Sequence, residues 1–130
     1  MQAILSSPSL LRNALLVDAI ATGATGLLMA ATASLLAPLL GLHENLIFYA
    51  GLLLIPFAGF VYLTANGQPI SRKAAMAIVI LNALWVIDSI ALLASGWIEP
   101  TALGYVFVVG QALIGGLFAE LQYVGLRRTA

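Results

Sequence analysis

The chain has no cysteine, one lysine and one histidine. Without cysteine it cannot form disulfides, iron–sulfur clusters, thiolate zinc sites or cysteine nucleophiles. His43 is expected in a loop, which excludes bis-histidine haem ligation within one protomer and any histidine-rich metal site. Lys73 is expected at a membrane edge, which removes the buried Schiff-base lysine of a retinal protein. We therefore expect no metal site and no cofactor.

Charge is also scarce. Only 8% of the 130 residues are charged, five basic and five acidic, whereas 62% are apolar. A soluble domain has about 25% charged residues, so these few charges cannot cover a water-exposed surface, and the composition predicts a protein of the lipid bilayer. Five dispersed basic residues do not indicate nucleic-acid binding. A serine–histidine–aspartate set can form only through His43, and no glycine-rich phosphate loop is present, so we expect no catalytic activity.

Four long apolar stretches dominate the chain, and its mean hydropathy is +1.08. Each supplies about 20 residues, the length with which an α-helix crosses roughly 30 Å of hydrocarbon. The short connections between them favour antiparallel neighbours. The sequence therefore predicts an all-α fold, an up-down-up-down four-helix transmembrane bundle in which the last helix closes against the first. Residues 1–130 form its single domain, with helices near 9–39, 45–65, 71–95 and 100–126.

The basic residues all lie on one side of the predicted spans. They are Arg12, Arg72, Lys73, Arg127 and Arg128. The loops on the other side carry only His43, Glu44 and Glu99. By the positive-inside rule, the basic side is cytoplasmic, so both termini are expected in the cytoplasm.

The first span also imitates a secretory signal peptide, because Arg12 precedes the apolar run and small residues occupy positions 31–33. Asp18 inside the apolar region argues against a signal peptide. We interpret residues 9–39 as a retained helix.

Polar side chains within the spans are the candidate functional residues. Asp88 and Gln111 each lie about 22 Å from the basic ends of adjacent helices, so we predict that they pair. Asp18 lies roughly 9 Å from Arg12, and Glu120 has a similar depth, about 10 Å from the basic end of the last helix.

Helical spacing predicts which of these side chains face inward. Asn82, Trp85 and Ser89 share one stripe of the third helix, with Asp88 at its edge, and Gln111 and Gln122 share a stripe of the fourth helix. The candidates for binding or coupling are Asp88, Gln111, Asn82, Trp85, Asp18 and Glu120.

Each candidate also has a structural interpretation. Asn82 and Gln111 are typical of hydrogen bonds between membrane helices, worth about 0.6 kcal/mol each. Inserting a central carboxylate such as Asp88 costs about 2.5–3.5 kcal/mol, which indicates either a paired group or one used in transport, proton coupling or binding. Asp18 and Glu120 are near enough to the interface to reach water or an arginine. Glu120 falls opposite Gln111 on its helix, so it faces either outward, toward a second subunit, or the first helix if the fourth is rotated.

Three segments carry a resemblance: NALWVIDS at 82–89, QA at 111–112 and FAELQYVGLRR at 118–128. With them the chain resembles a family of small bacterial four-helix integral membrane proteins of uncharacterised activity. The resemblance covers most of the chain and implies a location in the bacterial inner membrane. Small multidrug exporters and fluoride channels have a similar size, but the exporters' membrane-centre glutamate and the channels' arginine and phenylalanine signatures are missing.

Two functions fit these features. The first is a non-catalytic inner-membrane protein, either an accessory or assembly subunit or a protein that holds a lipid-like molecule between its helices. Minimal loops and the little room that four helices leave for a pore favour it. The second is a small oligomeric transporter or channel that uses Asp88 and Gln111, with Asn82 beside them. The expected partners are the lipid bilayer and either further copies of the chain or a larger membrane complex.

Overall fold

A computed structural model describes residues 8–67 and 69–128, and these residues form four helices. Each helix is long and apolar enough to cross a membrane, which confirms the prediction of an all-helical, multi-pass membrane protein. Their ends differ from the predicted ones by no more than two residues. The helices are α2 (Pro8–Leu40), α3 (Glu44–Ala65), α4 (Arg72–Ala94) and α5 (Ala102–Arg128).

Local chemistry fixes where the helices begin and end. Ser71 precedes α4, and its hydroxyl accepts a hydrogen bond from the amide of Ala74 at 3.2 Å. Thr101 precedes α5 and accepts from the amide of Gly104 at 3.1 Å. Both are N-caps that satisfy otherwise unpaired amides of a first turn. Gly41 terminates α2 with a φ of +69°, a left-handed conformation that favours glycine.

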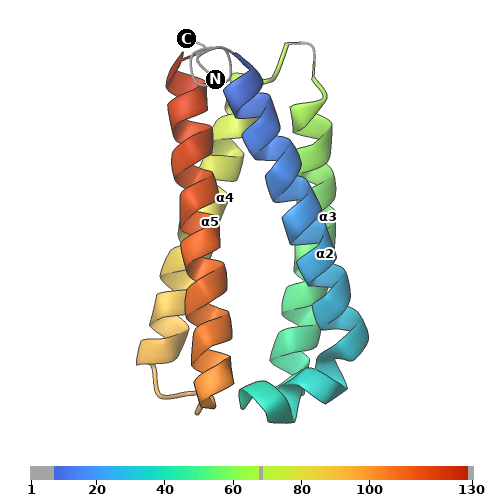
Figure 1. Cartoon of the computed structure of the whole chain (residues 1–130), viewed down its shortest axis with the longest axis vertical. Helices are drawn as coiled ribbons and strands as arrows, with labels where there is room; N and C mark the ends of the chain where they lie inside the picture. Colours follow the sequence, from blue (N-terminus) through green and yellow to red (C-terminus); the bar gives the residue numbers. More distant parts are fainter. Residues whose placement is uncertain (1–7, 68, 129–130) are drawn as a thin grey trace.

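The helix α2 is broken rather than straight. Its 33 residues would extend about 50 Å if straight, well beyond the roughly 30 Å of hydrocarbon. At Thr32 the backbone leaves helical geometry, with φ −122° and ψ 23°. The Thr32 hydroxyl donates to the carbonyl of Leu28 at 2.5 Å, a type of bond that bends helices. The last part of α2 therefore turns across the end of the bundle (Figure 1), where the sequence predicted one continuous span.

The helices form two pairs. In Figure 1, α2 packs along α3 and α4 packs along α5, while α2 and α5 connect the pairs. The contact between the last helix and the first agrees with the sequence prediction. In contrast, α3 and α4 barely touch, although the short connection between them predicted close neighbours.

Hydrogen bonds hold the helix ends together. At one end, the Arg12 guanidinium donates to the carbonyl of Gly67, and that of Arg72 donates to the carbonyl of Leu126, each at 2.8 Å. We call this end, which carries the arginines, the basic end. At the opposite end, the amide of Thr101 donates to the carbonyl of Leu40 at 3.0 Å. The start of α2 and the end of α5 therefore share the basic end.

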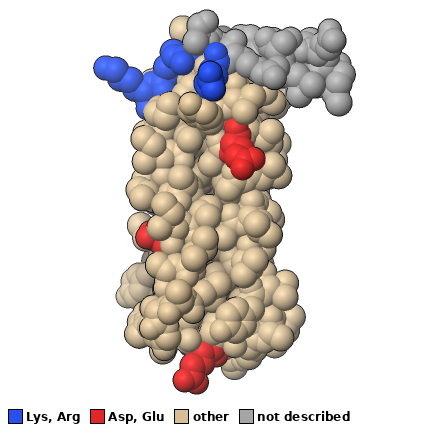
Figure 2. Space-filling view, turned by 90° about the vertical axis from the view of Figure 1, so that its left-hand side faces the viewer, with Lys and Arg blue, Asp and Glu red and all other residues tan. Residues whose placement is uncertain are grey.

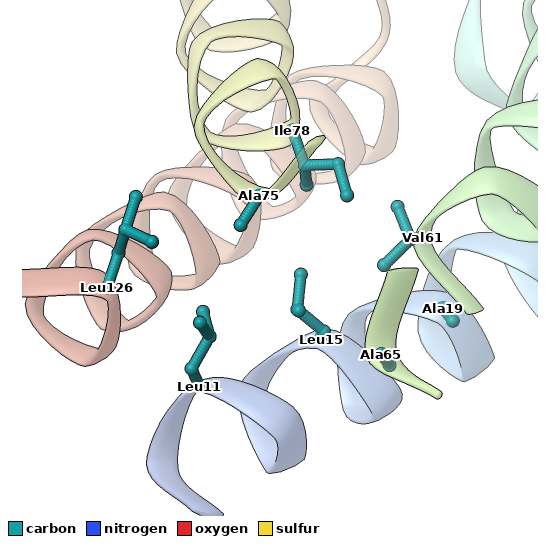
Figure 3. Close-up of a cluster of buried hydrophobic side chains, with 8 residues drawn as sticks. All are labelled: Leu11, Leu15, Ala19, Val61, Ala65, Ala75, Ile78 and Leu126. Carbon is teal, nitrogen blue, oxygen red and sulfur yellow. The ribbon is translucent and has the colours of Figure 1, made fainter. Parts of the chain in front are cut away.

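Buried apolar side chains gather at both ends of the bundle. Near the basic end, all four helices contribute to the Leu15 cluster, whose side chains point toward one another in Figure 3. Its members are Leu11, Leu15, Ala19, Val61, Ala65, Ala75, Ile78 and Leu126. The Ile47 cluster lies at the other end and consists of Met29, Ala33, Leu40, Leu42, Ile47, Ile98 and Val108.

Two glycines allow α2 and α3 to touch backbone to backbone. A Cβ atom on Gly26 would lie 2.8 Å from the carbonyl oxygen of Gly51, and a Cβ on Gly51 would lie 2.8 Å from that of Gly26. No other residue fits this approach without a shift of the helices. Small residues at such contacts are what membrane helices need, because lipid removes the hydrophobic drive for association.

We predict that Gly51→Ala lowers the free energy of unfolding by about 1–3 kcal/mol, the usual cost of overpacking. Gly59 on the same helix is the matched control, since no heavy atom lies within 4 Å of a Cβ built there. Gly59→Ala should be neutral or stabilising by up to about 1 kcal/mol through helix propensity. Reversible unfolding in mixed micelles titrated with dodecyl sulfate measures both. Equal effects of the two substitutions would contradict the close approach.

Candidate functional site

Asp18 lies at the centre of a buried polar network. Its side chain is 1% exposed. One carboxylate oxygen accepts from the Thr22 hydroxyl at 2.8 Å. The other accepts from the side-chain amides of Asn82 at 2.9 Å and Gln122 at 2.7 Å. The network therefore joins three helices, α2, α4 and α5.

The two amides also bind each other. Asn82 donates to the side-chain oxygen of Gln122 at 3.1 Å, which closes a ring with Asp18. Three donors point at the carboxylate and occupy its oxygens with hydrogen bonds. Within residues 8–67 and 69–128, no group of three or more metal-ligating side chains gathers.

Glu120 does not contact Asp18, although the two residues were predicted at similar depth on touching helices. Glu120 is exposed, so the outward orientation is the correct one of the two considered. Gln122, only two residues further along α5, points inward and takes the place beside Asp18. Two residues correspond to about 200° around a helix, so Glu120 and Gln122 lie at similar depths on nearly opposite faces of α5.

The predicted pair of Asp88 and Gln111 is absent. The Gln111 oxygen accepts from the indole N–H of Trp85. Its amide donates to the Ser89 hydroxyl at 3.0 Å and to the carbonyl of Val108 at 2.9 Å. Trp85 and Ser89 lie on the inward stripe of α4, whereas Asp88 lies at its edge, so the inward Gln111 meets the first two instead.

Asp88 differs from the other candidate carboxylates inside the spans. It faces a cavity and has no partner among the described residues. It forms no hydrogen bond or ion pair with any residue that the structure describes. It is exposed on the protein and lines both lobes of the cavity between the helix pairs.

This central cavity has two lobes that meet around Asp88. The Asp18 lobe has a volume of about 380 Å³ and begins at Asp18, Thr22 and Asn82. The Asn45 lobe has a volume of about 470 Å³ and extends to Leu42 and Asn45, at the end opposite the arginines. Both lobes share Thr25, Leu53, Leu54, Trp85, Asp88 and Gln111.

The cavity opens sideways between α3 and α4. Leu53 on α3 and Leu81 and Leu84 on α4 line the Asp18 lobe and are exposed. Because α3 and α4 barely touch, nothing in the described chain closes this side. In a membrane, the opening faces acyl chains.

The cavity combines apolar walls with a few polar side chains. Its walls are mostly leucine, isoleucine, phenylalanine and small residues, with a few polar side chains at defined places, as in small-molecule sites generally. No protein-family profile, curated protein or solved structure matches the chain. The functional argument therefore depends on this geometry.

Gln122 and Thr25 are site residues that were not among the sequence-predicted candidates. Gln122 falls on the inward stripe of its helix together with Gln111, and that stripe was the available signal for it. Thr25 lines both lobes. It lies two turns beyond Asp18 on α2, at the spacing of a residue on the same face.

We predict that Asp18→Ala lowers the free energy of unfolding by about 1–3 kcal/mol, because it leaves buried amide donors without an acceptor. Glu120→Ala removes an exposed carboxylate from the same half of the bundle and should change stability by less than about 0.5 kcal/mol. Unfolding in dodecyl sulfate measures both variants. If Asp18→Ala were as mild as Glu120→Ala, the network would not stabilise the fold.

Proposed function

We propose that this chain is a non-catalytic membrane protein that holds a lipid-like molecule in the central cavity. The observation that supports this most strongly is an apolar cavity within the bundle, open between α3 and α4. A molecule already dissolved in the bilayer enters such a site laterally, without crossing water. The lobe volumes of about 380 and 470 Å³ fall within the range of about 300–1,000 Å³ that is usual for ligand sites.

The position of the polar groups supports an amphipathic ligand. The walls of both lobes suit an apolar chain, and Asp88 and Thr25 lie where the lobes meet. A polar headgroup at this junction with an apolar chain along a lobe satisfies both kinds of surface. In this proposal the protein acts as an accessory or assembly subunit that carries or presents its ligand within a larger membrane complex.

We further propose an up-down-up-down arrangement in the bacterial inner membrane, with the basic end in the cytoplasm. In Figure 2, lysine and arginine side chains gather at one end of the molecule, and acidic side chains lie at the opposite end and along the span. Such an asymmetry favours retention of the basic end on the cytoplasmic side.

A reporter that is active only in the cytoplasm, fused after Ala130, tests this orientation. Ala130 itself lies outside the described residues. The fusion should be active, and the same reporter inserted at Gly96, between α4 and α5, should be inactive. The reverse pattern would contradict the orientation.

The second candidate function is a small oligomeric transporter or channel. It is favoured by Asp88, a carboxylate inside the span that faces the cavity without a protein partner. In liposomes, this function requires a pH-dependent flux that Asp88→Asn abolishes while assembly stays intact. If the wild-type protein assembles in the liposomes but carries no flux, the transport function is excluded and the binding function remains.

Trp85 provides a direct readout of cavity occupancy, because it lines both lobes. The chain has two tryptophans, so Trp97→Phe leaves Trp85 as the only one. We predict that a long-chain fatty alcohol with a brominated tail, added to this variant in phosphatidylcholine nanodiscs, quenches Trp85 fluorescence in a saturable manner. Bound bromine atoms quench at short range, whereas a probe that merely dissolves in the bilayer quenches in proportion to its concentration.

Blocking the cavity supplies the control. Thr25→Phe places a ring where the lobes meet and should remove the saturable component. Leu28→Phe adds the same ring to an exposed position of α2, where Leu28 is 56% exposed, and should leave the component intact. Quenching that rises linearly in all three proteins would contradict the proposed function.

A further inference from the structure

The junction of the two lobes contains a carboxylate, Asp88, that lies inside the span. Gln111 and the indole N–H of Trp85 bind each other, and the amide of Gln111 has two further partners. Asp88 has none among the described residues. A carboxylate inside hydrocarbon is costly unless a partner compensates it, so Asp88 indicates which ligand chemistry the cavity favours.

No basic side chain that the structure describes supplies that partner. Lysine and arginine occur only at the basic end, and Lys73, on the same helix, is about 22 Å away along the axis. The opposite end, toward which the Asn45 lobe extends, carries Glu44 and Glu99 and no lysine or arginine. The charged side chains that line the cavity, Asp18 and Asp88, are both acidic, and negative groups attract a positively charged ligand.

Trp85 adds a second feature that suits a cation. It precedes Asp88 by about one helical turn and lines the same two lobes. Its hydrogen bond to Gln111 fixes the orientation of the ring. The π-system of an indole attracts ammonium groups, and the Trp85 indole and the Asp88 carboxylate line the same two lobes.

We propose that the central cavity selects cationic amphiphiles, with an ammonium headgroup against Asp88 and Trp85 and a single long apolar chain along the lobes. This inference rests on the proposed binding function and specifies its ligand class. An anionic headgroup at this point meets an unscreened carboxylate, and a neutral headgroup gains no ion pair.

Three brominated probes with one chain length test the proposal: an alkylammonium, a fatty alcohol and a fatty carboxylate. Each is titrated into the Trp97→Phe protein in phosphatidylcholine nanodiscs, with partitioning corrected by empty nanodiscs. We expect the ammonium probe to bind at least about tenfold more tightly than the alcohol, which corresponds to about 1.4 kcal/mol. The carboxylate should bind more weakly than the alcohol.

Variants separate the headgroup preference from the cavity itself. Asp88→Asn should remove the preference for ammonium over alcohol and leave alcohol binding unchanged, which also reports an intact fold. Asp88→Glu keeps the charge and should retain the preference. Glu120→Gln is the matched control, because Glu120 is an exposed carboxylate that lines neither lobe, and it should retain the preference as well.

The outcomes distinguish the two levels of the proposal. If the alcohol binds saturably but the ammonium probe binds no better, or if Asp88→Asn keeps the preference, the cationic ligand class is wrong and the binding function stands. If none of the three probes quenches Trp85 saturably, the binding function itself is wrong. If Asp88→Asn fails to fold, the comparison of the three probes on the Trp97→Phe protein, which keeps Asp88, still decides the ligand class.

Discussion

The architecture depends on how a buried carboxylate finds donors where no water is available. In hydrocarbon, an unsatisfied charge or polar group costs several kcal/mol, so polar side chains must satisfy one another within the protein. Asp18 does this by accepting hydrogen bonds from Thr22, Asn82 and Gln122. These bonds join α2, α4 and α5 next to the Leu15 cluster. No α3 side chain takes part in the network. Instead, α3 is held to α2 by the close contact of Gly26 and Gly51.

This division of contacts explains why the bundle contains a cavity. The polar network joins α4 and α5 to α2, and the glycine contact joins α3 to α2, but no comparable contact joins α3 to α4. The helix pairs are fastened at their two ends, by the Leu15 cluster and by the Ile47 cluster with the Thr101–Leu40 hydrogen bond. Between these ends, the walls separate. The two carboxylates that line the cavity therefore differ: Asp18 accepts three hydrogen bonds, whereas Asp88 has no partner among the described residues.

The sequence predicted the helices well because length and apolarity are sufficient to identify a membrane span. It also predicted the depth of the polar groups, which follows from the helical rise alone. To predict which side chains pair, the rotation of each helix about its axis must also be known, and depth alone gave the wrong pairs. Asp18 contacts Gln122 rather than the nearby Glu120, and Gln111 contacts Trp85 rather than Asp88. The break at Thr32 and the separation of α3 from α4 depend on contacts between distant segments. No periodicity in the sequence records such contacts.

The central claim, that the cavity opens to lipid between α3 and α4, is tested most directly by nuclear Overhauser contacts of the protein in lipid nanodiscs. With selectively protonated phosphatidylcholine chains, the ring protons of Trp85 and the methyl groups of Leu53 and Leu84 should show contacts to acyl-chain methylene protons. Contacts between the side chains of Leu53 and Leu84, without any from Trp85 to lipid, would show that α3 packs against α4 and that the cavity is closed.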